Sequence, residues 1–362
     1  MPTPLESHIH SLIVSSGGWI AFDDFMAQAL YAPDRGYYSK GSNILGSLPH
    51  KDGSDFVTAP EISPLFGQTI ARQIAQALEA TGTDEIWEFG AGTGALALQI
   101  LNALDAMGVS VRKYTIVDLS NALKERQRET LQPHSERVEW VSALPDAFNG
   151  VVVGNELLDA MPVKLLARVG GVWHERGVVW HENAFVFADK PTDLRPPLEV
   201  SGNHDYLTEI HPQAEAFMRT LGEHLGKGAI FLLDYGFPEA EYYHEQRITG
   251  TLMCHRAHRM DENPLEAVGD KDITSHINFT GIAVAGQDAG LEVLGYTNQA
   301  YFLLNCGFGD RLMEASRTDR ISAQKLIFEH EMGEFFKVIG FTKGEFWDAI
   351  GFARGDRTHK LG

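Results

Sequence analysis

The stretch Glu88-Phe89-Gly90-Ala91-Gly92-Thr93-Gly94 decides the fold of this 362-residue chain. An apolar run that ends at Phe89 precedes the glycines, and a helical periodicity from Ala95 to Met107 follows them. A glycine-rich turn that joins a strand to a helix is typical of α/β sheets that bind nucleotide-like ligands. The glycines allow a close approach of the backbone, and the helix N-terminus offers free N–H groups. We therefore expect a ligand site at this turn.

Strands and helices alternate after this turn, which predicts a mostly parallel sheet. The expected strands cover residues 85–89, 113–119, 137–141, 150–155, 229–234, 291–298 and 333–341. From residue 163 to 189 the periodicity changes to two, which indicates antiparallel hairpins inserted into the α/β scaffold. We expect a helical N-terminal cover region over residues 1–80. The second domain is expected over 81–362, with insertions at about 163–205 and 236–278.

Composition and charge exclude several classes of protein. The apolar share of 44% is ample for a core, and no apolar run reaches the length of a membrane span. The formal net charge of −19 argues against binding to a nucleic-acid phosphate backbone. The sequence therefore predicts neither a nucleic-acid partner nor membrane insertion, and it carries no signal for the oligomeric state.

The first residues, Met1-Pro2-Thr3-Pro4-Leu5-Glu6, indicate where the protein is expected to reside. They have neither the basic start and apolar stretch of a secretory signal nor the Arg-rich character of a mitochondrial presequence. The two cysteines, Cys254 and Cys306, provide no disulfide framework and fit a reducing compartment. We therefore expect a cytoplasmic location.

The order of residues in the turn indicates which class of ligand binds there. E-x-G-x-G-x-G differs from the dinucleotide pattern G-x-G-x-x-G and resembles the first motif of S-adenosylmethionine-dependent methyltransferases. Glu88 ends a buried strand, where a carboxylate is costly unless it is paired or hydrogen-bonded. Asp118 ends the second strand, where an acidic side chain can accept both hydroxyls of a ribose. Alternatively, Glu88 only stabilises its own loop, and Asp118 is an ordinary residue at a strand end.

Asn155-Glu156-Leu157-Leu158-Asp159 follows the fourth strand, next to the point where strand order reverses and ligands bind. Asn155, Glu156 and Asp159 could hold a planar guanidinium, because paired hydrogen bonds match that group. A carboxylate in that position would also accept the proton released during methyl transfer. In the alternative, Asn155 caps a helix whose first turn contains the two acids. Asp234-Tyr235-Gly236 ends the fifth strand at the same edge, where it either lines the substrate side or only forms a turn.

Other kinds of site are disfavoured. Cys254, His255 and His258 could suggest a metal site, but no second cysteine pair is present and two arginines lie among them. A serine hydrolase would need a G-x-S-x-G elbow, and an NAD-dependent oxidoreductase would need G-x-G-x-x-G. A non-catalytic protein that keeps the cofactor fold, as an assembly or interaction module, is a further alternative.

Several stretches together resemble the MidA family of S-adenosylmethionine-dependent methyltransferases, and the resemblance covers nearly the whole chain. The family's mitochondrial member is complex I assembly factor seven, a protein arginine methyltransferase. The stretches that carry the resemblance are Gly36-Tyr37-Tyr38, Asp55-Phe56-Val57-Thr58-Ala59-Pro60-Glu61-Ile62-Ser63, Glu88–Gly94, Asn155–Pro162, Leu233-Asp234-Tyr235-Gly236, Gly250-Thr251-Leu252, Asp272-Ile273-Thr274-Ser275-His276-Ile277 and Phe279-Thr280.

The resemblance implies a Rossmann-like class I methyltransferase sheet of seven strands, with S-adenosylmethionine as the cofactor. It also implies symmetric dimethylation of an arginine in a protein acceptor, the 49-kDa-type subunit of respiratory complex I. Glu156, with Asn155 and Asp159, would orient and deprotonate that arginine. The residues expected to bind the cofactor are Thr58, Pro60, Glu61, Glu88, Gly90, Ala91, Gly92, Thr93, Gly94, Asp118 and Leu119. For Thr58, Pro60 and Glu61 the alternative is a rigid turn that only caps the next helix.

Overall fold

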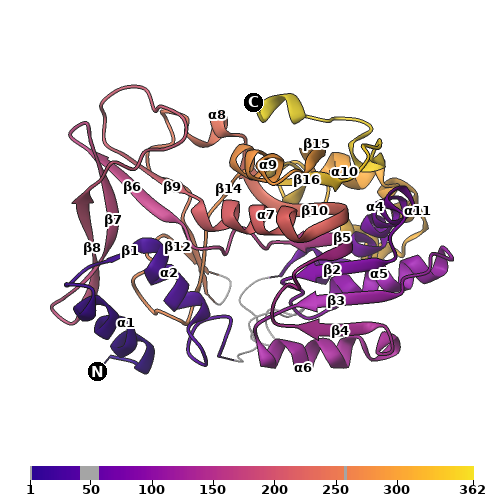
Figure 1. Cartoon of the computed structure of the whole chain (residues 1–362), viewed down its shortest axis with the longest axis horizontal. Coiled ribbons are helices and arrows are strands. Elements are labelled where there is room, and N and C mark those ends of the chain that lie inside the picture. The colour runs from indigo at the N-terminus through magenta and orange to yellow at the C-terminus, as the bar shows by residue number, and fades with distance from the viewer. Residues whose placement is uncertain (1, 41–56, 257–258) are drawn as a thin grey trace.

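A large sheet forms the centre of the molecule (Figure 1). The structure is a computed structural model that describes residues 2–40, 57–256 and 259–362. Seven strands follow the order β15-β16-β10-β5-β2-β3-β4, and an eighth, β14, pairs with β10. Their bounds are Glu85–Phe89 (β2), Lys113–Val117 (β3), Val138–Val141 (β4), Phe148–Asn155 (β5), Leu225–Phe237 (β10), Ile277–Asn278 (β14), Glu292–Asn298 (β15) and Phe336–Lys343 (β16).

Strands β4, β3, β2, β5 and β10 are parallel, whereas β16 runs antiparallel to both of its neighbours. The strand order reverses at β2, which pairs with β3 on one side and with β5 on the other. The carboxyl ends of these three strands therefore open around a single crevice. The α/β fold class predicted from the sequence is confirmed.

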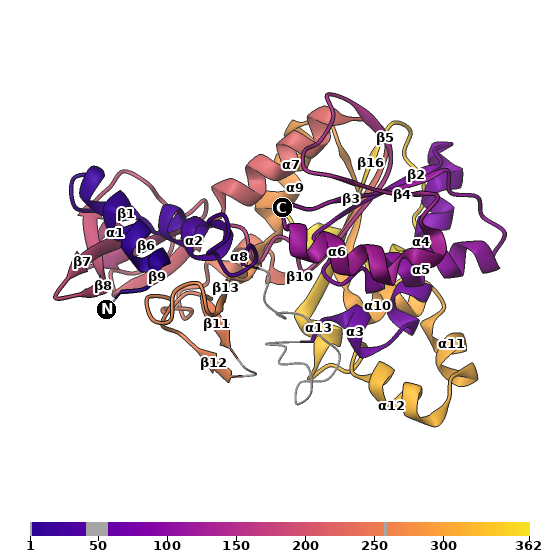
Figure 2. The ribbon, with the colours of Figure 1, turned by 90° about the horizontal axis from the view of Figure 1, so that it is seen from below.

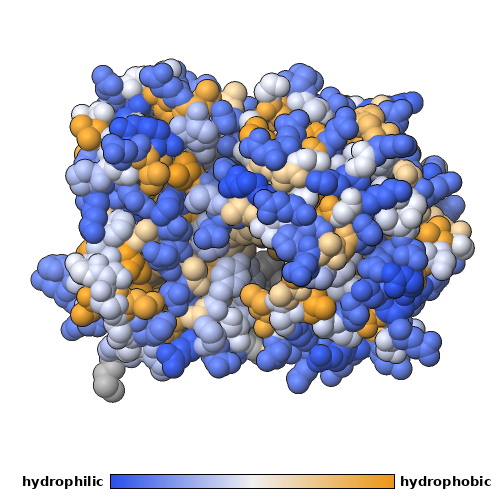
Figure 3. All heavy atoms as spheres, in the orientation of Figure 1, coloured by the Kyte–Doolittle hydropathy of each residue, from blue (hydrophilic) through white to orange (hydrophobic). Residues whose placement is uncertain are grey.

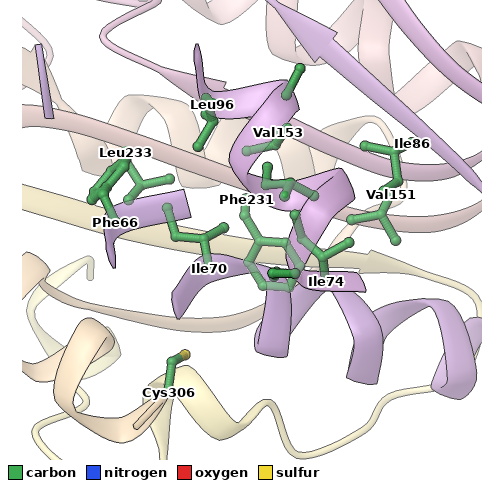
Figure 4. Close-up of a cluster of buried hydrophobic side chains, with 14 of the residues drawn as sticks. Phe66, Ile70, Ile74, Ile86, Leu96, Val151, Val153, Phe231, Leu233 and Cys306 are labelled. Atoms are coloured by element: carbon green, nitrogen blue, oxygen red, sulfur yellow. The ribbon is translucent and has the colours of Figure 1, made fainter. Parts of the chain in front are cut away.

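Helices cover both faces of this sheet, and the strand sequences explain why. Val151 and Val153 of β5 pack into one core cluster and Val152 into another, because successive side chains point to opposite faces. Figure 4 shows the first cluster, in which side chains of α4 and α5 meet those of β2, β5 and β10. The helices that pack on the two faces are α4 (Leu65–Thr81), α5 (Ala95–Ala106), α10 (Gln299–Asn305) and α11 (Phe308–Glu314) on one, and α7 (Pro212–His224) and α9 (Phe279–Asp288) on the other.

A second lobe, called the N-terminal lobe because it contains the first helices of the chain, lies beside the main sheet (Figures 1 and 2). Its antiparallel sheet has the order β1-β7-β6-β9, with β8 paired to β7, and a separate three-stranded sheet has the order β12-β11-β13. The apolar faces of α1 and α2 pack on these strands. The bounds are Pro4–Ser15 (α1), Ile20–Ala21 (β1), Phe22–Tyr31 (α2), Lys164–Val169 (β6), Val172–His181 (β7), Ala184–Pro191 (β8), Tyr206–Ile210 (β9), Met253–Arg256 (β11), Arg259–Asp261 (β12) and Asp272–Thr274 (β13).

The lobe brings distant parts of the chain together. Ile20 pairs with Val178 across β1 and β7, and Phe25 packs against Phe185 with ring centroids 5.3 Å apart. The antiparallel hairpins expected near residue 163 are therefore present, and the N-terminal helices contact them. The division of the chain at residue 80 stays a prediction.

The remaining elements are short. They are α3 (Ala59–Ile62), α6 (Asn121–Thr130), α8 (Glu239–Tyr242), α12 (Arg317–Gln324), α13 (Met332–Phe335) and three 3₁₀ turns, at Gln132–His134, Ile350–Phe352 and Thr358–Lys360. The last strand begins at Phe336 rather than at Gly333, because the chain folds back there and Gly333 N–H donates to the Phe328 carbonyl at 3.0 Å.

The surface agrees with the acidic, polar composition. Hydrophilic residues predominate on the face in Figure 3, and hydrophobic ones are scattered among them. None of the described helices combines the length and the apolar character that a membrane span requires.

Candidate active site

A pocket of about 410 Å³ opens at the carboxyl ends of β2, β3 and β5. Its volume lies in the range of small-molecule sites. The glycine turn lies along one part of the pocket, and the N-terminal lobe contributes another. The lining residues are Tyr31, Tyr38, Ser39, Thr58, Pro60, Glu61, Glu88–Thr93, Ala95, Leu96, Val117–Ser120, Leu123, Ser142, Asn155, Glu156, Leu157 and Ala160.

The three glycines of the turn all adopt left-handed backbone conformations. The φ angles are +65° at Gly90, +55° at Gly92 and +84° at Gly94. Side chains are strained at such angles, so glycine lets the chain turn sharply between β2 and α5. Gly90 and Gly92 line the pocket, whereas Gly94 does not. A Cβ at Gly94 would lie 3.4 Å from the backbone of Gln127, so this glycine allows α5 and α6 to approach each other.

Asp118 is joined to the glycine turn by Gln127, a residue that the sequence analysis did not identify. The Gln127 amide donates to Asp118 Oδ2 at 2.8 Å and to the Gly92 carbonyl at 3.0 Å. Its own carbonyl accepts a hydrogen bond from Trp140 Nε1. Ser120 N–H donates to Asp118 Oδ1 at 2.8 Å. The carboxylate is therefore fixed relative to the turn while still lining the pocket.

Glu88 is nearly inaccessible, yet it lines the pocket. The Tyr114 hydroxyl donates to Glu88 Oε2 at 2.8 Å. Burial raises the pKa of Glu88 to about 8, the hydrogen bond from Tyr114 opposes this shift, and the charge of Asp118 adds to it. A cation in the pocket would favour the charged form of this carboxyl group.

The segment from Thr58 to Glu61 borders the pocket beside the glycine turn. Thr93 Oγ1 donates a hydrogen bond to Glu61 Oε1, and Gln99 Nε2 donates to the Pro60 carbonyl at 2.8 Å. Thr58, Pro60 and Glu61 all line the pocket. The segment is therefore attached to α5 and to the glycine turn.

Among the residues that line the pocket, Glu156 has the least favourable backbone conformation. Its φ angle is +51°, a left-handed conformation that is rare for residues other than glycine. Its carboxylate accepts from Asn155 Nδ2 at 2.9 Å and from Ala59 N–H at 3.5 Å. Asn155 ends β5, and residues 156–163 form bends, turns and irregular backbone without a helix, so the alternative of a capped helix is excluded. Strain of this kind persists where surrounding contacts impose it, and it occurs often at functional sites.

Asp234 imposes this conformation. Its Oδ2 accepts three consecutive backbone N–H groups, from Leu157 at 3.1 Å, Leu158 at 2.8 Å and Asp159 at 3.2 Å. The Glu156 N–H donates to the Leu233 carbonyl at 2.9 Å. Asp234 is absent from the pocket lining and is fully buried, so it holds the loop and does not line the substrate side.

Asp159 lies behind the pocket wall and does not line the pocket. Its carboxylate accepts a hydrogen bond from the Tyr235 hydroxyl. Burial raises the pKa of Asp159 to about 6, and burial together with the charge of Asp159 raises the pKa of Glu156 to about 8. Among the described residues, neither carboxylate forms an ion pair with Lys, Arg or His. The Oδ1 atom of Asn155 is also buried, without a hydrogen-bond partner in the described part of the chain.

The N-terminal lobe contributes side chains that the sequence analysis did not assign to the site. Tyr31, at the end of α2, donates its hydroxyl hydrogen to the Ala160 carbonyl at 2.9 Å. Tyr38 donates to Asp272 Oδ1 at 2.9 Å, and Ser39 completes this side of the pocket. The stretch Gly36-Tyr37-Tyr38 was noticed only as part of a resemblance, because spacing alone does not show where a distant lobe folds.

A sequence profile of the family described as "Putative S-adenosyl-L-methionine-dependent methyltransferase" matches residues 69–297. This range is more than half of the chain and contains the glycine turn, Asp118 and Glu156. The chain belongs to this family. It is an S-adenosylmethionine-dependent methyltransferase by membership, and the enzyme class and cofactor expected from the sequence are confirmed.

Solved structures and curated proteins agree with the family. A Burkholderia thailandensis protein, crystallised with S-adenosyl-homocysteine bound, is 49% identical, with a TM-score of 0.95 over 99% of both chains. The mitochondrial protein arginine methyltransferase NDUFAF7 of Danio rerio is 26% identical over 91% of this chain and 85% of its own length. NDUFAF7 of Homo sapiens is 26% identical over 86% of this chain and 75% of its own length. The resemblance to the MidA family is confirmed.

The expected cytoplasmic location is contradicted by these curated relatives, which are named as mitochondrial proteins. The expectation was based on the lack of a recognisable targeting signal in the first residues and on two cysteines that fit any reducing compartment. A missing pattern is weak support for any compartment.

The metal site that the sequence analysis disfavoured involves one residue, His258, that lies outside the described residues. Cys254 packs in the apolar core of the N-terminal lobe, and burial raises the pKa of its thiol to about 12. Within residues 2–40, 57–256 and 259–362, no group of three or more His, Cys, Asp or Glu side chains is placed to hold a metal ion.

Replacing Gly92 with valine tests the glycine turn. We expect the affinity for S-adenosyl-homocysteine to fall at least about a hundredfold, because a branched side chain is strained at φ +55° and would project at the pocket. Gly108→Val is the matched control, since Gly108 has φ +71° and open space around it at the far end of α5. Calorimetric titration of both variants measures the affinity. Equal affinities would contradict the assigned role of the turn.

Replacing Glu156 with glycine tests whether the left-handed backbone conformation of this residue destabilises the protein. We expect the free energy of unfolding to rise by about 1 kcal/mol at pH 5, because glycine adopts the left-handed conformation freely. The gain should be larger at pH 8.5, where the folded protein must bury an ionised Glu156 whose pKa is raised to about 8. Urea denaturation at both pH values measures the difference. The control is Glu182→Gly, at φ +49° on the exposed β7–β8 turn, where glycine relieves the same backbone conformation outside the pocket. A gain that depends on pH equally in both variants would contradict this explanation.

Proposed function

We propose that this protein transfers methyl groups from S-adenosylmethionine to the guanidinium of an arginine in a protein acceptor. The single observation that carries the proposal is Glu156, a carboxylate that lines the cofactor-sized pocket without forming an ion pair among the described residues. A half-buried carboxylate in this state favours a cationic ligand with several N–H donors. The NDUFAF7 relatives, which are named protein arginine methyltransferases, support the same acceptor.

The pocket residues fit the cofactor. The Cβ-free Gly90 and Gly92 and the N-terminus of α5 suit close contact with its methionine part, and Asp118 presents a carboxylate to the ribose hydroxyls. Glu88 would face the positively charged methionine part, where its carboxylate would be stabilised in the ionised form. S-adenosylmethionine, when bound, supplies an electrophilic methyl group on a positively charged sulfur.

Glu156 has two tasks in this proposal. Its carboxylate holds the guanidinium by paired hydrogen bonds, which directs one nitrogen at the methyl group and localises charge away from that nitrogen. When the N–C bond forms and the C–S bond breaks, the same nitrogen loses a proton to Glu156. Asn155 Oδ1 is available as a further acceptor for an N–H group, and Asp159 contributes negative charge from behind the wall.

The identity of the acceptor is the finer part of the proposal. We propose a subunit of respiratory complex I, because of the resemblance to the MidA family, and symmetric dimethylation as the product. The net charge of −19 is compatible with a basic acceptor segment.

Glu156→Gln tests the assigned chemistry. The amide keeps the size of the side chain but neither accepts a proton nor balances a guanidinium charge. We expect an unchanged affinity for S-adenosyl-homocysteine by calorimetry and a loss of at least about a hundredfold in kcat. Transfer of tritiated methyl groups to arginine peptides or isolated complex I subunits measures turnover. Wild-type turnover in this variant would remove Glu156 from the mechanism.

The pH dependence of the rate provides a separate test. The raised pKa of Glu156 means that the carboxyl group is protonated, and inactive as a base, at low pH. We therefore expect kcat/KM for the acceptor, at saturating cofactor, to rise with pH and level off at or below about pH 8. The rise in kcat should be centred at a lower pH, because a bound guanidinium stabilises the carboxylate. A profile that is flat from pH 5 to 9 would contradict the role of Glu156 as a proton acceptor.

A further inference from the structure

We propose that the ring of Tyr31 is the surface on which the acceptor's guanidinium stacks, with Tyr38 holding that ring in place. The inference rests on the proposed function, because it assumes that the acceptor is an arginine. It adds a specificity-determining residue, contributed by the N-terminal lobe, that is remote in sequence from the glycine turn and from Glu156.

The first observation is the position of the two rings. Both line the same pocket as Glu156, and α2, which ends at Tyr31, lies between the antiparallel sheet and the main sheet (Figures 1 and 2). The Tyr31 hydroxyl is bonded to Ala160, only four residues past Glu156. The rings therefore lie at the Glu156 end of the pocket and not at the Asp118 end.

The second observation is that the ring face of Tyr31, rather than its hydroxyl, is available. The rings of Tyr31 and Tyr38 are stacked with centroids 5.6 Å apart and planes 20° from parallel. The buried Tyr37 packs edge-on against Tyr38, at 5.1 Å, from another direction. Tyr31 is the outermost of the three rings and is 37% exposed, while both its hydroxyl and that of Tyr38 are engaged in hydrogen bonds.

The third observation is the charge around these rings. Burial and the charges of Asp272 and Asp159 raise the pKa of the Tyr31 hydroxyl well above its usual range, so the ring stays neutral. The charges that act on Glu156 come from Asp159 and Asp272, and no described cation acts on it. A guanidinium between Tyr31 and Glu156 would stack on an aromatic face and satisfy a carboxylate at the same time. The Oδ1 atom of Asn155, which has no hydrogen-bond partner among the described residues, is a further acceptor within the same pocket.

The test compares two substitutions of one side chain. Tyr31→Phe keeps the ring and loses only the bond to Ala160, whereas Tyr31→Leu keeps bulk without the aromatic face. The probe is a synthetic peptide with a single arginine between glycines, and the same peptide with citrulline provides a neutral side chain of matching shape. Tyr301→Leu is the control variant, because Tyr301 is 43% exposed on α10 and does not line the pocket.

We expect Tyr31→Leu to raise KM for the arginine peptide about tenfold, with kcat and the affinity for S-adenosyl-homocysteine changed less than about twofold. Tyr31→Phe should stay within about threefold of the wild type, and Tyr301→Leu should match the wild type. The complex of wild-type protein with S-adenosyl-homocysteine should bind the arginine peptide at least about tenfold more tightly than the citrulline peptide, by calorimetry.

Other outcomes separate the two proposals. An equal rise in KM for the arginine peptide in Tyr31→Phe and Tyr31→Leu would show that the hydroxyl bond matters and not the ring. Weaker binding of S-adenosyl-homocysteine in Tyr31→Leu would assign the ring to the cofactor. Either result overturns the inference. If the wild-type complex binds the arginine peptide but does not methylate it, the proposed function fails, and the stacking surface is then judged by peptide binding in the two variants. A wild-type complex that binds both peptides equally overturns the stacking proposal.

Discussion

The geometry of the site depends on one buried carboxylate, that of Asp234. A single oxygen of this side chain receives three consecutive N–H groups from the loop after β5, and this draws the loop onto the end of β10. Glu156, at the start of the loop, is thereby held in a left-handed conformation with its carboxylate at the pocket. Burial and the neighbouring charges of Asp159 and Glu156 raise the pKa of Asp234 well above its usual range, so the loop is stabilised at the expense of placing acidic groups together.

The same loop is where the two lobes meet. Its far end bonds to Tyr31 of α2 through Ala160, and Ser275 N–H donates to the Asp159 carbonyl at 3.0 Å. Tyr38 bonds to Asp272, which belongs to β13 of the second lobe. In the proposed function, the cofactor half of the pocket would be formed by the glycine turn, the end of β3 and the segment from Thr58 to Glu61, whereas the acceptor half would lie between the loop after β5 and the end of α2. The first half suits a shared cofactor, and the second is where relatives with different acceptors can differ.

This division explains how much could be predicted from the sequence. The position of the glycine turn, Asp118 and Glu156 at one pocket could be predicted, because residues at the carboxyl ends of parallel strands share one edge of the sheet. The role of Gln127 could not be predicted, because its contact with Gly92 spans 35 residues of the sequence. Nothing in the sequence distinguishes this glutamine from other polar residues on a helix. Tyr31 was not assigned to the site, because its bond to the loop spans 129 residues. Asp234 was expected at this edge with its role left open, because its bonds to the loop span up to 77 residues. Asp159 was expected in the site and instead supports it from behind, because its side chain faces Tyr235.

The pairing of Ile20 with Val178 has a consequence for synthesis on the ribosome. The amphipathic helices α1 and α2 are translated before the strands that cover their apolar faces, which follow roughly 10–30 s later at about 5–20 residues per second. During that interval the nascent chain exposes Phe22, Phe25 and Met26, which the finished protein buries completely. We therefore expect the N-terminal segment to be a binding site for chaperones that act during translation, and the lobe to fold only after the antiparallel hairpins have emerged.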